Sequence, residues 1–156
     1  MAFVEFENVG KTYQMGQVQI NALHDASFTV EKGELVVIVG PSGAGKSTQA
    51  ELWHTHLGAE ILNGDRTVIR RTEDGFTGSG SMWSGTSGIY KPEQAPIAGI
   101  FLPVKSTENR VERLHFQAFA PLFSQTIVNS WDTTFMDRII SLFASLLEQV
   151  PVYRLY

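Results

Sequence analysis

Eight consecutive residues have the types and spacing to hold phosphate. The pattern G-x-x-x-x-G-K-[ST] is matched by Gly40, Pro41, Ser42, Gly43, Ala44, Gly45, Lys46 and Ser47. Glycines let successive backbone N–H groups turn inward around a phosphate without a Cβ in the way, and Lys46 adds positive charge at the β- and γ-phosphates. The Ser47 hydroxyl is suited to ligate Mg²⁺. The pattern therefore predicts a site for a nucleoside triphosphate with Mg²⁺.

The segments on either side of this loop suit a phosphate site. Residues 34–40 form a continuous apolar, β-branched run, which is typical of a central strand buried on both faces. Residues 46–57 have Ala50, Trp53 and Leu57 at helical spacing. A helix that begins at the loop would add its unpaired N–H groups and its positive dipole end. The alternative, a glycine-rich turn with a coincidental lysine, is disfavoured by this strand–loop–helix context.

The rest of the pattern predicts a mixed sheet with helices. Strands are expected at 2–8, 59–62, 96–104, 109–115 and 151–156, loops or hairpins at 10–16 and 67–90, a tight turn at 31–33, and helices at 116–128, with a break at Pro121, and from 132 to about 150. We expect the last helix to be deeply buried. The fold class is α/β of the P-loop NTPase type, with N-terminal antiparallel strands, the loop after a central strand, and helices packed on the sheet. A terminal strand at 151–156 would leave an edge through which a homodimer could form.

Length and composition set the broad class. A chain of 156 residues is expected to be a single domain over 1–156. The net charge of −4 gives no overall attraction for nucleic acid or an anionic membrane. The absence of cysteine excludes disulfides and is typical of a reducing compartment. No signal peptide and no membrane-spanning run is visible, so we expect a cytoplasmic domain with no nucleic-acid or membrane partner.

The first part of the chain resembles the start of an ABC-transporter ATPase subunit. The stretches that carry the resemblance are FENVGKTY, ALHDASFTVEKGELVVIVG and PSGAGKST, within residues 1–48. The resemblance implies ATP as the ligand, phosphate contacts that extend to Thr48, and stacking of adenine on Tyr13. Packing of Tyr13 on the sheet is an equal alternative. The sequence holds no LSGGQ signature, so no transporter partner is expected.

The second part resembles small proteins similar to HPr serine kinase, which share a P-loop core with phosphoenolpyruvate carboxykinase. The stretches are SGAGKSTQAELW, GAEILNGDR, WSGTSGIY, PIAGIFLPV and FMDRIISLFASLLEQVPVYRLY, within residues 42–156. The resemblance implies that Asp65 holds Mg²⁺ with Ser47, and that Lys46 and Asp65 serve phosphoryl transfer. Gly64 stands where the family often has a second acid. A solvated turn carboxylate is the alternative for Asp65.

Two further side chains are candidates for nucleotide contacts. Arg66 could reach phosphate oxygens, although a surface position also tolerates arginine. Trp83 could cap a nucleotide, although a core or lid role is commoner for such a residue.

The two resemblances overlap only at residues 42–48. The sequence therefore predicts a chimera joined within the P-loop, engineered rather than natural, with a divergent natural protein as the alternative. The predicted function is that of an ATP-binding P-loop domain with weak or no phosphoryl transfer. An HPr-kinase-like phosphotransferase of unknown acceptor and a folded protein without significant nucleotide binding remain alternatives.

Overall fold

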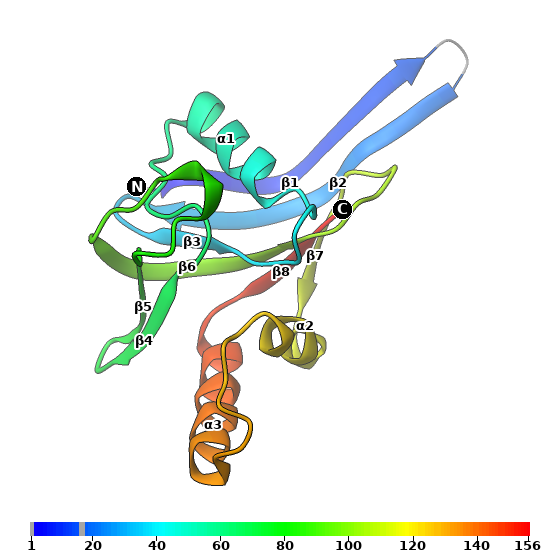
Figure 1. Ribbon diagram of the computed structural model, residues 1–156. Helices are drawn as coiled ribbons and strands as arrows, with labels where there is room; N and C mark the ends of the chain where they lie inside the picture. Colours follow the sequence, from blue (N-terminus) through cyan, green and yellow to red (C-terminus); the bar gives the residue numbers. More distant parts are fainter. Residues whose placement is uncertain (1, 16–17) are drawn as a thin grey trace.

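The computed structural model describes the backbone of residues 2–15 and 18–156, and the side chains of residues 5, 7 and 29–156. These residues form a two-stranded ribbon, a mixed sheet and helices (Figure 1). The ribbon is β1 (Ala2–Met15) with β2 (Val18–Glu31). The sheet contains β3 (Leu35–Ile38), β4 (Val68–Thr72), β5 (Gly75–Ser79), β6 (Gln94–Pro103), β7 (Val111–Leu114) and β8 (Val152–Leu155). The helices are α1 (Lys46–Leu57), α2 (Phe119–Ser124) and α3 (Thr133–Gln149), with short 3-10 turns η1 (Gly85–Ser87) and η2 (Phe116–Ala118). The predicted mixed α/β class is confirmed.

Strand β6 organises the sheet. It pairs in parallel with β3 and β8 and antiparallel with β5, while β4 lies beside β5 and β7 beside β8. Its residues Ile100 and Phe101 are each 1% exposed. A strand with partners along its length and no exposed face must be apolar throughout. The predicted strand at 96–104 is therefore confirmed as the centre of the fold.

The terminal strand does not lie at an edge, contrary to the sequence prediction. Tyr153 of β8 is opposite Phe101 of β6 and also opposite Arg113 of β7. Since β8 is hydrogen-bonded on both sides, the edge proposed for a homodimer is already occupied. The prediction was wrong because sequence order says nothing about the order of strands in a sheet.

The amino-terminal ribbon also differs from the prediction. The expected loop at 10–16 is strand up to Met15, and Tyr13 is opposite Ile20 in the ladder. Register shifts on both sides of Val9 accommodate the glycine next to it. The Tyr13 side chain lies outside the described residues. After the ribbon, Glu34 N–H donates to the Glu31 carbonyl at 3.1 Å, which confirms the tight turn that leads into β3.

Residues 59–62 do not form the predicted strand. The chain instead pairs with the loop at 89–91, where Lys91 N–H donates to Leu62 O at 2.8 Å and Gly64 N–H donates to Ile89 O at 3.1 Å. Among the described residues, β3 therefore pairs only with β6. Within β3 only Val37 is buried, so the predicted burial on both faces is wrong. One long edge of β3 faces a cavity instead of a strand.

Helix α2 runs through Pro121, where a break was predicted. Proline is tolerated there because a residue in the first turn has no intrahelical acceptor for its N–H group. Phe119 and Phe123 on this side of the fold contact Phe143 of α3 edge-on, with ring centroids 5.8 and 5.4 Å apart. These aromatic contacts join α2 to α3.

Helix α3 has the predicted bounds but not the predicted depth. Asp132 caps it, since its Oδ1 accepts from Phe135 N–H at 3.0 Å. Only Phe143 and Leu146 of the helix are buried, and Ile140 remains 45% exposed. Figure 1 shows the helix extending away from the sheet, so that mainly its carboxyl end packs on the core. Among the described residues, none of the helices has the length and hydrophobicity that crossing a bilayer requires.

Replacing the cap of α3 should destabilise the protein. We expect Asp132→Ala to lower the free energy of unfolding by about 1 kcal/mol, because the Phe135 N–H loses its acceptor. Urea unfolding monitored by circular dichroism measures the change. Asp132→Asn keeps an acceptor oxygen and should retain most of the stability; an equal loss in both variants would contradict the cap.

Candidate functional site

The loop between β3 and α1 has the backbone conformation that a phosphate cradle requires. Gly43 and Gly45 have φ angles of 79° and 97°. A Cβ added at either position would meet no atom within 4 Å, so conformation and not space calls for glycine here. Ala44 N–H donates to Pro41 O at 3.2 Å and closes the first turn of the loop. The structure therefore places residues 40–45 in a compact turn ahead of α1.

Helix α1 begins at this loop without a competing cap. Gly45 occupies the N-cap, no side chain accepts from the first N–H groups, and the first turn holds no acidic residue. Ser47 and Thr48 lie in this first turn and are exposed. Unpaired N–H groups and the positive dipole end suit an anion. These features fit a polyphosphate without rearrangement of the backbone.

Lys46 links the two ends of the loop. Its Nζ donates to Gly40 O at 2.8 Å and to Pro41 O at 3.0 Å. The ammonium group is therefore held over the loop by neutral carbonyl oxygens. A phosphate oxygen is a stronger partner because it is charged, so a bound polyphosphate would attract the same group.

Few contacts with the other described side chains hold helix α1 on the sheet. None of its residues is buried, and the predicted apolar stripe leaves Leu57 38% exposed. The main aromatic contact is Trp53 against Phe101, edge-on with ring centroids 5.2 Å apart. Phe101 in turn stacks on Tyr153 at 5.0 Å. These three rings connect α1, β6 and β8.

Asp65 lies in a turn that other segments hold in place. Its backbone N–H donates to Asn63 Oδ1 at 2.9 Å, and the Ser81 hydroxyl donates to Arg66 O at 2.6 Å. The Asp65 carboxylate is 3.9 Å from Arg66 Nε, with both side chains 47% exposed, so this ion pair is weak. The carboxylate therefore remains accessible to a cation.

Gly64 has no room for a side chain. A Cβ there would lie 1.8 Å from Ser87 Oγ and 2.8 Å from Ser84 O. The Ser87 hydroxyl is itself engaged, since it donates to Ser84 O at 2.7 Å. A second acid at position 64, as in the HPr-kinase-like pattern, is thus incompatible with the turn over residues 84–88. This explains why Asp65 stands alone.

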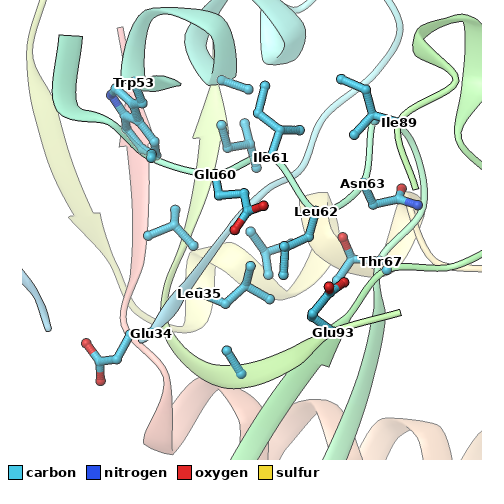
Figure 2. A pocket seen from close by; sticks show the side chains of 18 of the residues that line it. Glu34, Leu35, Trp53, Glu60, Ile61, Leu62, Asn63, Thr67, Ile89 and Glu93 are labelled. Atoms are coloured by element: carbon cyan, nitrogen blue, oxygen red, sulfur yellow. The ribbon is translucent and has the colours of Figure 1, made fainter. Parts of the chain in front are cut away.

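A cavity of about 560 Å³ lies beneath α1, and Figure 2 shows part of its lining, from Trp53 to Glu93. Three predicted residues line it together: Lys46, Ser47 and Asp65. Among the described residues, no three histidine or acidic side chains are grouped so as to hold a metal by themselves. Protein ligands for Mg²⁺ would be the Ser47 hydroxyl and the Asp65 carboxylate, and phosphate oxygens and water would complete the shell. This donor set suits a metal that arrives with a nucleotide.

Trp83, the predicted cap of the nucleotide, lies apart from this cavity. Trp83 is 60% exposed and does not line it, although the Trp83 carbonyl accepts from Arg66 N–H at 3.1 Å. Tyr13 has no described side chain. Neither aromatic residue is therefore placed over the loop by an observed contact.

Sequence reasoning missed the cavity and its carboxylates. Glu60 and Glu93 both line it. A hydrogen bond and charge attraction from Lys91 hold the pKa of Glu60 below its ordinary value. Only the tertiary fold shows that these residues lie together, because they come from segments that no motif connects.

Comparisons with known proteins concern the first part of the chain. Residues 23–68 match the family model described as ABC transporter. Methionine import ATP-binding protein MetN 1 of Pseudomonas fluorescens is 49% identical over 49 residues, which cover 31% of this chain and 15% of that protein. An uncharacterized ABC transporter ATP-binding protein of Methanocaldococcus jannaschii is 36% identical over 86 residues, covering 47% of this chain and 37% of that protein. Methionine import ATP-binding protein MetN 3 of Oceanobacillus iheyensis is 47% identical over 49 residues, 31% and 14% of the two chains. No solved structure matches the chain.

The matches support an ABC-like P-loop segment. This chain spans well under half of the length of these relatives, between 14% and 37%. The matched range continues beyond Thr48 to residue 68 and so includes α1 and Asp65. The similarity of residues 42–156 to HPr-kinase-like proteins stays a prediction.

Steric exclusion at position 64 can be tested by substitution. We expect Gly64→Ala to lower the free energy of unfolding by about 1–3 kcal/mol, because the new Cβ overlaps Ser87 Oγ and Ser84 O. Urea unfolding gives the change. In a Ser87→Gly background the further loss caused by Gly64→Ala should be smaller, since one overlapping atom is gone. Equal losses in the two backgrounds would show that the turn over residues 84–88 does not limit this position.

Proposed function

We propose that the chain is an ATP-binding P-loop domain. The phosphates would lie on residues 40–48, with Ser47 and Asp65 as protein ligands of Mg²⁺. The observation that carries this proposal is the geometry of the loop: left-handed glycines lead into an uncapped helix start, and Lys46 stands over the loop. Bound Mg²⁺ would neutralise charge on the β- and γ-phosphates.

Similarity supports the choice of ATP. The relatives that match the first part of the chain are named as ATP-binding proteins, and the match spans the whole loop. The described side chains contain no base-reading group at the loop, and so ATP rather than another nucleoside triphosphate is inferred from similarity alone. Stacking of adenine on Tyr13 belongs to the same inference.

Turnover by this chain alone is expected to be slow or absent. Phosphoryl transfer needs a residue that positions or activates the acceptor, besides the phosphate and metal contacts. Asp65 is the one acid of the 63–65 turn, and Gly64 leaves no space for a second. The sequence also contains no LSGGQ signature to cover the loop of a second ATPase subunit. Lys46 and Asp65 would therefore hold ATP and metal more effectively than they promote chemistry.

We further propose that the chain is an engineered chimera joined within the P-loop. The support is the resemblance of the later stretches of the sequence to HPr-kinase-like proteins, whereas the match to the ABC transporter family model covers residues 23–68. Such a join is physically tolerable, because β3 reaches the remainder of the sheet through backbone pairing, from Leu35 opposite Ile97 to Ile38 opposite Phe101. Backbone pairing depends little on side-chain identity.

A phosphotransferase with an unknown acceptor is the second candidate. The observation in its favour is that Lys46 and Asp65 line a cavity whose far wall comes from residues 79–95, where an acceptor would have to bind. Acceptor-stimulated ADP release would distinguish this activity from ATP binding alone.

Binding should depend on Lys46. We expect saturable binding of a non-hydrolysable Mg-ATP analogue by calorimetric titration, and a loss of about tenfold or more in Lys46→Ala, because a charge-assisted contact to phosphate is removed. Arg138→Ala, at an exposed cation on α3, is the matched control and should bind normally. If the parent protein is folded but does not bind the analogue, the proposed function is wrong and the loop has only a structural role.

The metal contribution of Asp65 can be separated from phosphate binding. We expect Asp65→Asn to bind the nucleotide without Mg²⁺ as the parent does, and to lose most of the gain in affinity that Mg²⁺ gives, since the carboxylate is the charged protein ligand. Titrations with and without Mg²⁺ measure both quantities. An unchanged gain would remove Asp65 from the metal site.

A further inference from the structure

The cavity beneath α1 is larger than a phosphate site needs. Its volume of about 560 Å³ falls in the range of small-molecule pockets, which is roughly 300–1,000 Å³. Leu35, Trp53, Leu62 and Ile89 supply apolar surface from β3, α1 and the two loops that face them (Figure 2). It therefore combines the size and the lining of a ligand site.

The cavity adjoins the phosphate-binding loop at one end and extends away from it. Of residues 40–47, only Lys46 and Ser47 line it, and the backbone of Gly43 and Gly45 does not. The part lined by Leu35, Leu62 and Glu93 contains none of the residues assigned to the nucleotide or its metal. A second ligand can thus be accommodated while the loop is occupied.

The charges around the cavity disfavour an anion. Among the residues whose side chains are described, its lining contains six carboxylates and two ammonium groups, from Glu31, Glu34, Glu51, Glu60, Asp65 and Glu93 against Lys32 and Lys46. Glu60 is neutralised by Lys91, whereas Glu51 and Glu93 make no ion pair with any described residue. Figure 2 shows Glu60 and Glu93 turned toward the space around Leu35 and Leu62. A cation there would gain attraction, and an anion would be repelled.

We propose that this cavity is a second binding site, which takes a small molecule with an apolar body and an ammonium group. The apolar body would lie against Trp53, Leu35 and Leu62, and the ammonium group would pair with Glu93. This site goes beyond nucleotide binding. The cavity shares Lys46, Ser47 and Asp65 with the proposed nucleotide site, and the amine would contact none of these three.

Three probes with one apolar body and different head groups test the proposal. Phenylbutylamine, phenylbutanol and phenylbutyrate differ in charge but hardly in size. In a Trp83→Phe, Trp131→Phe background, Trp53 is the one remaining tryptophan of the three in the chain, and its fluorescence reports occupancy of the cavity. We expect the amine to bind about fivefold or more tightly than the alcohol, and the carboxylate to bind most weakly. Equal binding of all three, or no binding of any, would overturn the proposal.

The role of Glu93 is tested by removing its charge. Glu93→Gln should weaken the amine about fivefold and leave the alcohol unchanged, while Glu108→Gln, an exposed carboxylate away from the cavity, should change neither. Circular dichroism checks that each variant is folded. An equal effect of the two substitutions would show that the amine senses only the overall charge of the protein.

The Lys46→Ala variant separates this proposal from the proposed function. It should lose nucleotide binding and keep amine binding, which is expected to strengthen because a positive charge next to the cavity is gone. Loss of amine binding in this variant, with its fold intact, would mean that the cavity is not an independent site.

Discussion

The pairing of β6 with three other strands is the constraint on which the structure depends. Buried backbone N–H and C=O groups must be hydrogen-bonded, and β6 meets this requirement through β3, β5 and β8. The last five residues of β6 are all buried, so neither face of the strand is open to solvent there. This arrangement also fixes the position of the P-loop. The chain leaves β3 beside Phe101, and the Phe101 carbonyl accepts a hydrogen bond from Val39 N–H at 2.8 Å. The loop therefore starts from a fixed point on the sheet.

On the other side of the loop, α1 is held much less firmly. Trp53 contacts Phe101, and Lys46 ties the first turn of the helix to the loop carbonyls. Between these two attachments the helix covers a cavity and not a packed core. A helix with few apolar contacts opens more readily than one whose face is buried.

The buried core is distributed unevenly along the chain, as the packing of α1 indicates. The ABC-like match ends at residue 68, while most of the buried core, from Phe76 through Val152, lies beyond it. The matched range meets the rest of the fold through the β3–β6 ladder, through Trp53, and through hydrogen bonds between residues 62–66 and residues 81–91. Close packing demands matched shapes, and the space between α1, β3 and residues 58–65 is left unfilled.

The sequence by itself determined what depends on neighbours along the chain. The glycine-rich loop, the bounds of α1 and the apolar run of β6 all follow from local conformation or periodicity, and each was predicted. Only the tertiary structure decided the position of β8 between β6 and β7, the failure of residues 59–62 to form a strand, and the crowding of Gly64 by Ser84 and Ser87. The tertiary structure alone also decided that Glu60 and Glu93 line one cavity. These features depend on contacts between segments distant in sequence, whose pairing is set by competition for hydrogen bonds and space across the whole fold and leaves no local pattern.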